Sequence, residues 1–235
     1  MRDKNILIVG ASSGIGSAIA TILRGQGANV YSASRHQGDT QSVVLHIPFD
    51  AQQPDFQGFT QLPDVIHGVV YCPGSINLKP FGRLSADDFK NDFQINVLGA
   101  VGVLQAVLPK LKRAEGASIV LFSTVAVQTG MGFHASIAAS KGAIEGLTRS
   151  LAAEWAANKI RVNAVAPSLT DTPLAEKLLS TDEKREASNR RHPLGRFGTA
   201  TDVANAAVFL LSDTSSWVTG QIMGVDGGLG TLRNV

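Results

Sequence analysis

Residues 5–16 read NILIVGASSGIG, a short apolar run that stops at a glycine-rich turn. The run has the length and β-branched content of a buried strand, and the segment Ile15–Arg24 that follows has the length of a helix. Glycines let the backbone of such a turn approach a pyrophosphate, and the helix N-terminus adds free N–H donors and a partial positive charge. The hydroxyls of Ser12 and Ser13 are further donors. The stretch therefore predicts a dinucleotide-binding strand, turn and helix; the alternative is a tight turn that binds no ligand.

Six more apolar runs of strand size alternate with segments of helix size along the chain. These runs are NVYSAS, SVVLHIP, VIHGVVYC, SIVLFS, RVNAVAP and QIMGV. The later helix-sized segments are Ala86–Arg113, Ser136–Asn158 and Asp202–Leu211. Strands that are apolar on both faces and separated by helices are typical of a parallel sheet covered on both sides. We therefore expect a single α/β domain over residues 1–235, a Rossmann-type, doubly wound parallel sheet of about seven strands flanked by helices.

The composition is that of a compact globular protein, with 44% apolar and 17% charged residues. The net charge is +2 and no dense run of lysine and arginine occurs, which argues against a nucleic-acid or membrane-surface partner. The apolar runs are far shorter than a membrane span, and the N-terminus lacks the long apolar segment of a signal peptide. Cys72 is the single cysteine, so no intrachain disulfide forms and the cytoplasm is the expected location. No metal site is expected.

Further motifs follow the glycine turn, whose spacing is Gly-x3-Gly-x-Gly. They are Asp50-Ala51, FQINVLGA around Asn96, RVNAVAPSLTDT at residues 161–172, and HPLGRFGTATDVANAAVFLL at residues 192–211. In these motifs the sequence resembles the short-chain dehydrogenase/reductase family, and the resemblance runs nearly end to end. Two places depart from it: YCPG at residues 71–74 stands where the family has Asn-Asn-Ala-Gly, and Ser168 stands where it usually has glycine.

The resemblance implies an oxidoreductase with a nicotinamide cofactor and a small-molecule substrate. Asp50 resembles the family's adenine-contacting aspartate, and Lys141 resembles the lysine that binds the nicotinamide ribose. The expected cofactor-binding residues are Gly10, Ser12, Ser13, Gly14, Ile15, Gly16, Ser34, Arg35, Asp50, Ala51, Cys72, Pro73, Gly74, Lys141, Pro167, Ser168, Thr170 and Thr172.

The end of the second strand bears on the choice between NAD(H) and NADP(H). NAD-binding folds place an acid about twenty residues after the glycine turn, whereas NADP binders place a cation there. The chain reads Ala-Ser-Arg-His at residues 33–36, with no carboxylate. Arg35 can form charge-assisted bonds to a 2′-phosphate, which favours NADP(H). The alternatives are that Arg35 is a solvated surface arginine and that Asp39 contacts a ribose.

Four family residues carry the chemistry, and one of them is replaced here. Asn96, Thr124 and Lys141 match the asparagine, the serine and the lysine, but Ile137 occupies the tyrosine position, four residues before the lysine. In the family, the tyrosine exchanges a proton with the substrate oxygen and the lysine lowers the tyrosine pKa from about 10. A positioned general acid contributes about 10²- to 10⁴-fold in rate. An isoleucine cannot supply that proton.

His134 is the candidate replacement for the missing acid. It stands seven residues before Lys141, two helical turns, so both side chains share a face if the helix extends that far. Histidine also suits proton transfer near neutral pH. The alternative is a polar loop histidine. The two tyrosines are less suitable: Tyr31 lies within the second strand, and Tyr71 ends the fourth strand on the expected cofactor side.

Two functions remain open from the sequence. The first is an NADP(H)-dependent reductase of carbonyls or conjugated double bonds with a non-standard catalytic set. The second is a catalytically inactive subunit that binds NADP(H) for regulation. Residues 172–191 are expected to cover the substrate, and Met131, Phe133, Leu174 and Leu178 suggest an apolar lining. The family resemblance implies a homo-oligomer, a dimer or a tetramer, and the small residues Ala138, Gly142 and Gly146 would let another helix approach closely.

Overall fold

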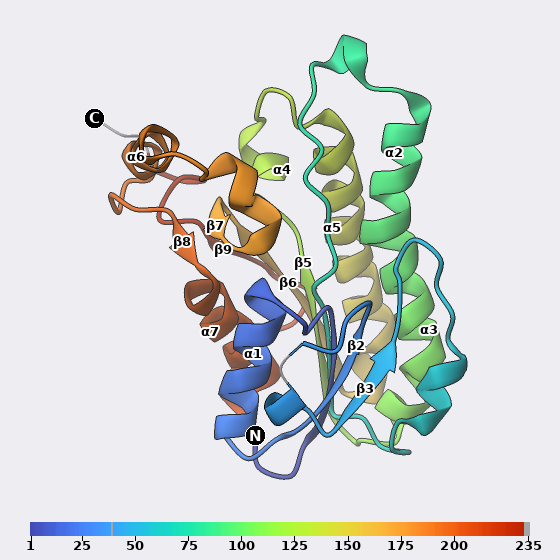
Figure 1. Ribbon diagram of the computed structural model, residues 1–235. Helices are drawn as coiled ribbons and strands as arrows, with labels where there is room; N and C mark the ends of the chain where they lie inside the picture. Colours follow the sequence, from blue (N-terminus) through green and yellow to red (C-terminus); the bar gives the residue numbers. More distant parts are fainter. Residues whose placement is uncertain (39, 233–235) are drawn as a thin grey trace.

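Seven parallel strands form one sheet in the order β3-β2-β1-β4-β5-β6-β9 (Figure 1). The computed structural model describes residues 1–38 and 40–232. The strands are β1 (Asn5–Val9), β2 (Asn29–Ser34), β3 (Leu45–Pro48), β4 (Gly68–Tyr71), β5 (Ala117–Phe122), β6 (Ile160–Pro167) and β9 (Ile222–Val225). Each of the seven predicted apolar runs overlaps one of these strands, so the predicted sheet is confirmed.

Strand β1 lies in the interior of the sheet and pairs with β2 on one side and β4 on the other. The chain order therefore reverses at β1. In open parallel sheets a ligand binds in the crevice at the carboxyl ends of the strands next to such a reversal. The glycine turn after Val9 and the loop after Tyr71 both begin at this point.

Helices cover both faces of the sheet, as predicted (Figure 1). Helices α1 (Gly14–Gly25) and α7 (Ala200–Leu211) pack together on one face. Helices α2 (Ala86–Phe93), α3 (Gly99–Lys112) and α5 (Ala135–Trp155) cover the other. Side chains of β1 alternate between two cores: Leu7 and Val9 belong to one, Ile6 and Ile8 to the other. This alternation explains why the strand is apolar at every position from Ile6 to Val9.

Helices α2 and α3 are continuous through a wide turn, η4 (Gln94–Leu98), which carries Asn96. Turns of this kind are frequent at functional sites. By length and composition, the joined helix Ala86–Lys112 passes the test for a membrane span, and 44% of the tested window is buried inside the fold. A buried core helix passes the same test, so this is weak evidence for a membrane role.

The segment after β6 contains structure that the sequence did not predict. A two-stranded sheet pairs β7 (Thr170–Asp171) with β8 (Gly198–Thr199), and the chain between them forms η6 (Pro173–Leu178) and α6 (Asp182–Arg191). Arg185 connects α6 to the small sheet, since its guanidinium lies 2.8 Å from the Asp171 carboxylate and its Cζ lies 4.9 Å from the centre of the Phe197 ring. Both contacts hold α6 beside the carboxyl end of the main sheet.

Candidate active site

Close backbone contact within the glycine turn explains its composition. A Cβ atom added at Gly16 would lie 2.1 Å from the carbonyl oxygen of Gly10, so any side chain there would force the turn open. Gly10 and Gly14 have φ angles of 84° and 54°, values that favour glycine. Ser13 caps α1 without a side-chain capping bond, which leaves its hydroxyl available to a ligand. The turn and the free N–H groups of α1 therefore fit a pyrophosphate.

A cleft of about 280 Å³ lies along this turn and the ends of β2 and β4. Its lining includes fourteen of the predicted cofactor residues: Gly10, Ser12, Ser13, Gly14, Ile15, Gly16, Ser34, Arg35, Asp50, Ala51, Cys72, Pro73, Gly74 and Thr172. Arg35 is exposed at its rim, and no hydrogen bond or ion pair involves its guanidinium within residues 1–38 and 40–232. Asp39, the alternative ribose contact, lies outside the described residues.

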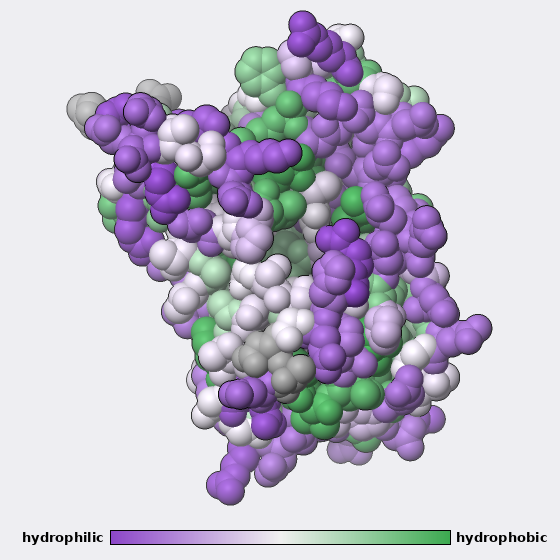
Figure 2. Space-filling model, viewed as in Figure 1, coloured by the Kyte–Doolittle hydropathy of each residue, from purple (hydrophilic) through white to green (hydrophobic). Residues whose placement is uncertain are grey.

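A second cavity, of about 310 Å³, adjoins the cleft and opens at the carboxyl ends of β5 and β6. The remaining predicted cofactor residues, Lys141, Pro167, Ser168 and Thr170, line this cavity. Five residues line both spaces: Ile15, Cys72, Gly74, Thr172 and Leu174. Figure 2 shows apolar side chains gathered in a hollow between the α6 side and the α2 side of the molecule. A cofactor in the cleft would thus meet a mostly apolar substrate space.

Lys141 and Thr124 are the polar groups that the sequence predicted for the wall of this cavity. The Lys141 ammonium donates to the Phe122 carbonyl over 2.8 Å, and burial lowers the pKa of the amine from 10.5 to about 8. Thr124 caps the short helix α4 (Val125–Thr129), where its oxygen accepts the N–H of Ala126 over 3.3 Å. The hydroxyl hydrogen of Thr124 therefore remains available to a substrate oxygen.

Asn96 lies behind the cavity rather than on its wall. Its side-chain amide donates to the Asp92 carbonyl over 2.7 Å and to the Ser75 hydroxyl over 2.9 Å, while its Oδ1 is buried without a partner in the described structure. A Cβ atom added at Gly74 would lie 3.5 Å from Asn96 Oδ1 and 3.7 Å from Lys141 Nζ. The asparagine and the lysine therefore approach one another beside the cofactor cleft.

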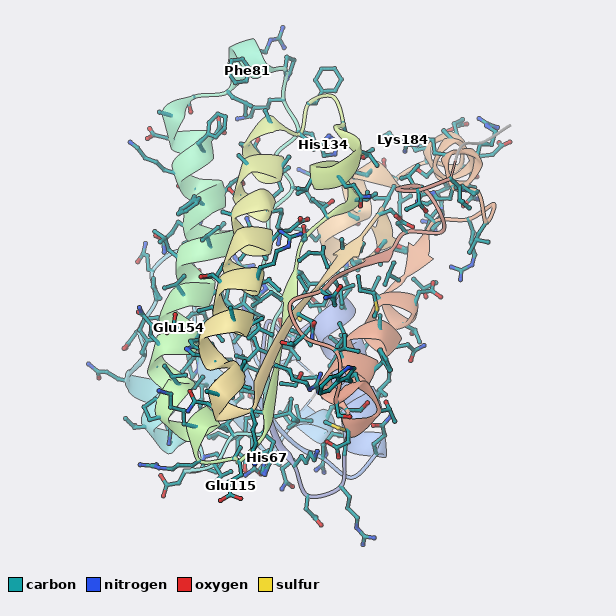
Figure 3. All side chains as sticks on the ribbon, turned by 180° about the vertical axis from the view of Figure 1, so that it is seen from behind. His67, Phe81, Glu115, His134, Glu154 and Lys184 are labelled. Atoms are coloured by element: carbon teal, nitrogen blue, oxygen red, sulfur yellow. The ribbon has the colours of Figure 1, made fainter. Side chains whose placement is uncertain are left out.

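Ile137 and His134 both line the cavity, from the start of α5. Ile137 is buried and offers only carbon atoms. His134 caps the helix, which begins at Ala135, and its Nδ1 lies 2.6 Å from the Gly132 carbonyl. Because a carbonyl only accepts, Nδ1 carries the hydrogen and the neutral ring keeps Nε2 as an acceptor. In Figure 3, His134 lies near the start of α5, at the end of the molecule opposite His67.

Tyr71 ends β4 beside the cleft residue Cys72, as predicted, but its side chain lies in the core. Its hydroxyl donates to the Ile95 carbonyl over 2.5 Å, and burial raises the pKa of the phenol far above its ordinary value. One placement suggested by the sequence is wrong. Phe133 does not line the cavity, since its side chain is 61% exposed. The other three expected apolar residues, Met131, Leu174 and Leu178, do line it.

The structure adds two polar pairs that the sequence reasoning missed. Ser75, on the cavity wall, donates to the buried Asp92 carboxylate over 2.5 Å. The Ser168 hydroxyl lies 2.8 Å from His192 Nε2, and both residues line the cavity. No local pattern signals either pair, because the partners are 17 and 24 residues apart.

Comparisons with known proteins agree with this architecture. A family profile described as Enoyl-(Acyl carrier protein) reductase matches residues 10–230. The 3-oxoacyl-[acyl-carrier-protein] reductase FabG of Thermotoga maritima is 35% identical over 244 residues, which cover 97% of this chain and 98% of that protein.

Two solved structures extend the comparison. Ligand-free aldohexose dehydrogenase of Thermoplasma acidophilum has a TM-score of 0.91 and 30% identity, covering 100% of this chain and 96% of that one. A candidate NAD(P)-dependent gluconate 5-dehydrogenase from Beutenbergia cavernae, with NADP bound at low occupancy, has a TM-score of 0.90 and 28% identity over 97% of each chain. The fold, the two adjoining cavities and these relatives define an oxidoreductase. The chain belongs to the short-chain dehydrogenase/reductase family, whose members use NAD(P)H.

Proposed function

We propose that the protein is an NADP(H)-dependent oxidoreductase that reduces a carbonyl or a conjugated double bond without the family's tyrosine. The observation that carries the proposal is the arrangement of Lys141 and Thr124. Both lie on the wall of an apolar cavity that adjoins the cleft built around the glycine turn. When bound, the cofactor supplies a hydride, and the cavity holds the carbon that accepts it.

The preference for NADP(H) rests on charge at the end of β2. Arg35 lies exposed at the rim of the cleft, next to Ser34, where a 2′-phosphate would meet a guanidinium. The NADP bound in the Beutenbergia cavernae relative supports this preference by analogy.

Each proposed catalytic residue has a task that its contacts permit. Lys141, fixed by the Phe122 carbonyl, has ammonium hydrogens left to bind the nicotinamide ribose. Thr124 donates its hydroxyl hydrogen to the substrate oxygen and orients it. Asn96 offers a hydrogen-bond acceptor behind Lys141, because its Oδ1 has no partner among the described residues. Residues 172–191, whose Leu174 and Leu178 line the cavity, cover the substrate.

The proton that Ile137 cannot supply must come from another group on the cavity wall. His134 contacts the substrate in this proposal and is the donor that the sequence predicts. With Nδ1–H directed at the Gly132 carbonyl, protonation adds a hydrogen at Nε2 that can be given to a substrate oxygen.

We also propose that the chain acts in the cytoplasm as a homo-oligomer, a dimer or a tetramer, through helix α5. A Cβ atom added at Gly146 would meet no atom within 4 Å, so another chain can approach this helix closely. Sedimentation should give a dimer or tetramer for the wild type and a smaller species for Gly146→Glu. A monomeric wild type would contradict the proposal.

The first experiment follows NADPH absorbance with ketones, aldehydes, quinones and enoyl thioesters as substrates, for the wild type and Ile137→Tyr. We expect turnover by the wild type and a faster rate, by about 10²-fold or more, for the variant on a ketone, because the variant regains a general acid. A silent wild type that binds NADPH, beside an active variant, would favour the alternative of an inactive cofactor-binding subunit.

A further inference from the structure

Ser168 and His192 form a hydrogen-bonded pair within the substrate cavity that none of the proposed roles uses. Ser168 follows the last residue of β6, and His192 follows the last residue of α6. The distance from Ser168 Oγ to His192 Nε2 is 2.8 Å. His192 is 3% exposed, so its polar atoms depend on protein partners or on what enters the cavity.

The second ring nitrogen of His192 fixes where the hydrogens lie. His192 Nδ1 is 2.7 Å from the carbonyl oxygen of Ser188. A carbonyl only accepts, so Nδ1 carries a hydrogen in every protonation state of this arrangement. In the neutral ring, Nε2 is therefore the acceptor and the Ser168 hydroxyl donates to it. In the protonated ring, Nε2–H donates to Ser168 and frees the serine hydrogen for another acceptor.

Ser168 lies close to the groups expected to contact the substrate. Strands β5 and β6 are neighbours, with Phe122 opposite Val165. Thr124 follows Phe122 by two residues and Ser168 follows Val165 by three, so both hydroxyls stand at adjacent strand ends. Neighbouring strands are about 4.8 Å apart. The same edge holds Lys141, which is bonded to the Phe122 carbonyl.

We propose that Ser168, in place of the sequence-predicted donor His134, delivers the proton that Ile137 cannot supply. His192 is then the positioning residue that acts through Ser168 and restores the hydrogen that the serine gives up. As hydride reaches the substrate carbon, the π electrons of the carbonyl move to its oxygen, and that oxygen takes the Ser168 hydrogen. Ser168 then takes the Nε2 hydrogen of protonated His192. The products are an alcohol, oxidised cofactor and neutral His192, which regains a proton from water at the cavity mouth. The inference rests on the proposed reductase function.

The charged groups around His192 bear on its pH dependence. Arg191 precedes it and lines the same cavity, as do Lys141 and His134. Arg196, in the next turn, is paired with Asp202 over 2.6 Å. Asp226, beside Gly227, accepts backbone N–H groups of Gly228 and Gly230 over 2.9 Å each. His192→Gln removes one titrating group and leaves these others in place.

A test that needs no turnover examines the ring directly. In the ¹⁵N spectrum of histidine-labelled protein, His192 is the resonance pair that His192→Gln deletes. We expect its neutral form to carry the hydrogen on Nδ1, and we expect Ser168→Ala to shift Nε2 far more than Nδ1. A neutral ring with its hydrogen on Nε2, or an Nε2 resonance that does not move in Ser168→Ala, would contradict the hydrogen bond from Ser168 to His192.

The kinetic test uses the substrate identified by the NADPH assay. Ser168→Ala should lower kcat by about 10²-fold or more, the usual contribution of general-acid catalysis, and Ser168→Thr, which keeps a hydroxyl, should recover part of it. For the wild type, kcat should fall as pH rises, because the relay needs the hydrogen that Nε2 carries only in the protonated ring. His192→Gln should remove that fall. His67→Gln should retain it, because His67 lies at the end of the molecule opposite the cavity residue His134 in Figure 3.

The outcomes separate this inference from the proposed function. An inactive wild type would overturn both. An active wild type with an unchanged pH profile in His192→Gln, or with a greater loss in His134→Gln than in His192→Gln, would overturn the Ser168–His192 relay and leave the reductase standing.

Discussion

The cofactor cleft and the substrate cavity share a wall but are built by different means. The cleft is shaped by backbone: the three glycines of the turn, the N-terminus of α1 and the ends of β2 and β4. The cavity is shaped by side chains from distant segments, including α5, the loop after β6, and α6. A backbone site depends on glycine at a few positions, whereas a side-chain site can exchange one polar group for another. The replaced family residue Ile137 accordingly lies on the cavity side.

The largest effect is expected from breaking the backbone site. In Gly16→Ala the added Cβ meets the Gly10 carbonyl, so the turn must shift, at about 3 kcal/mol or more. We expect NADPH affinity, measured by isothermal titration calorimetry, to fall by at least about 100-fold. Gly25→Ala, at the end of the same helix, is the matched control, because a Cβ there meets no atom within 4 Å. Equal affinity in the two variants would show that close packing of the turn is not needed.

Removing the buried charge of Lys141 should stabilise the folded protein. The lysine pKa falls from 10.5 to about 8 on folding, so below pH 8 the folded protein holds a buried charge that costs on the order of 3 kcal/mol. Between pH 8 and 10.5 the unfolded chain binds more protons, and wild-type stability therefore rises with pH. Below pH 8, Lys141→Met should raise the free energy of unfolding by about 1–3 kcal/mol, reduced by the loss of the hydrogen bond to the Phe122 carbonyl. This gain should fade as the pH rises toward 10.5.

Urea denaturation of the cofactor-free protein at pH 7 and pH 10 measures this difference. The exposed Lys112→Met serves as its control and should show no comparable pH-dependent gain. We also expect Lys141→Met to lose turnover. If Lys141→Met were less stable than the wild type at pH 7, the contacts of the ammonium would stabilise the fold by more than the burial of its charge costs.

The smallest of the three effects concerns cofactor choice at the rim of the cleft. A charge-assisted hydrogen bond contributes about 1.5–3 kcal/mol, so Arg35→Ala should weaken NADPH binding by about tenfold or more at low salt. NADH, which lacks the 2′-phosphate, should bind nearly as before. Arg113→Ala, at a surface arginine paired with Asp64, controls for the loss of one positive charge. Equal weakening of NADPH and NADH binding would remove Arg35 as the selecting residue.

The difference between the two regions also explains what the sequence could predict. The strand, turn and helix around Gly10–Gly16 are local in sequence, and their pattern predicted both the sheet and the cleft. The family resemblance implied that Lys141 and Thr124 share one site, and both line the same cavity. The pairing of Ser168 with His192 depends on where α6 folds back onto the sheet, which no local periodicity encodes. The Tyr71 side chain lies in the core because the wide turn at Ile95 offers a buried carbonyl to its hydroxyl, a contact that no local pattern indicates.

The reactivity of the single cysteine should report whether the cleft or the cavity holds a ligand. Cys72 lies on the wall common to both spaces, and burial raises the pKa of its thiol to about 12. Because alkylating reagents attack the thiolate, the rate of modification depends on how often solvent reaches this wall. A cofactor in the cleft or a substrate in the cavity would each cover Cys72 from its own side. The kinetics of one labelling reaction, with no competing thiol in the chain, would therefore report binding in either space even in a variant that cannot turn over.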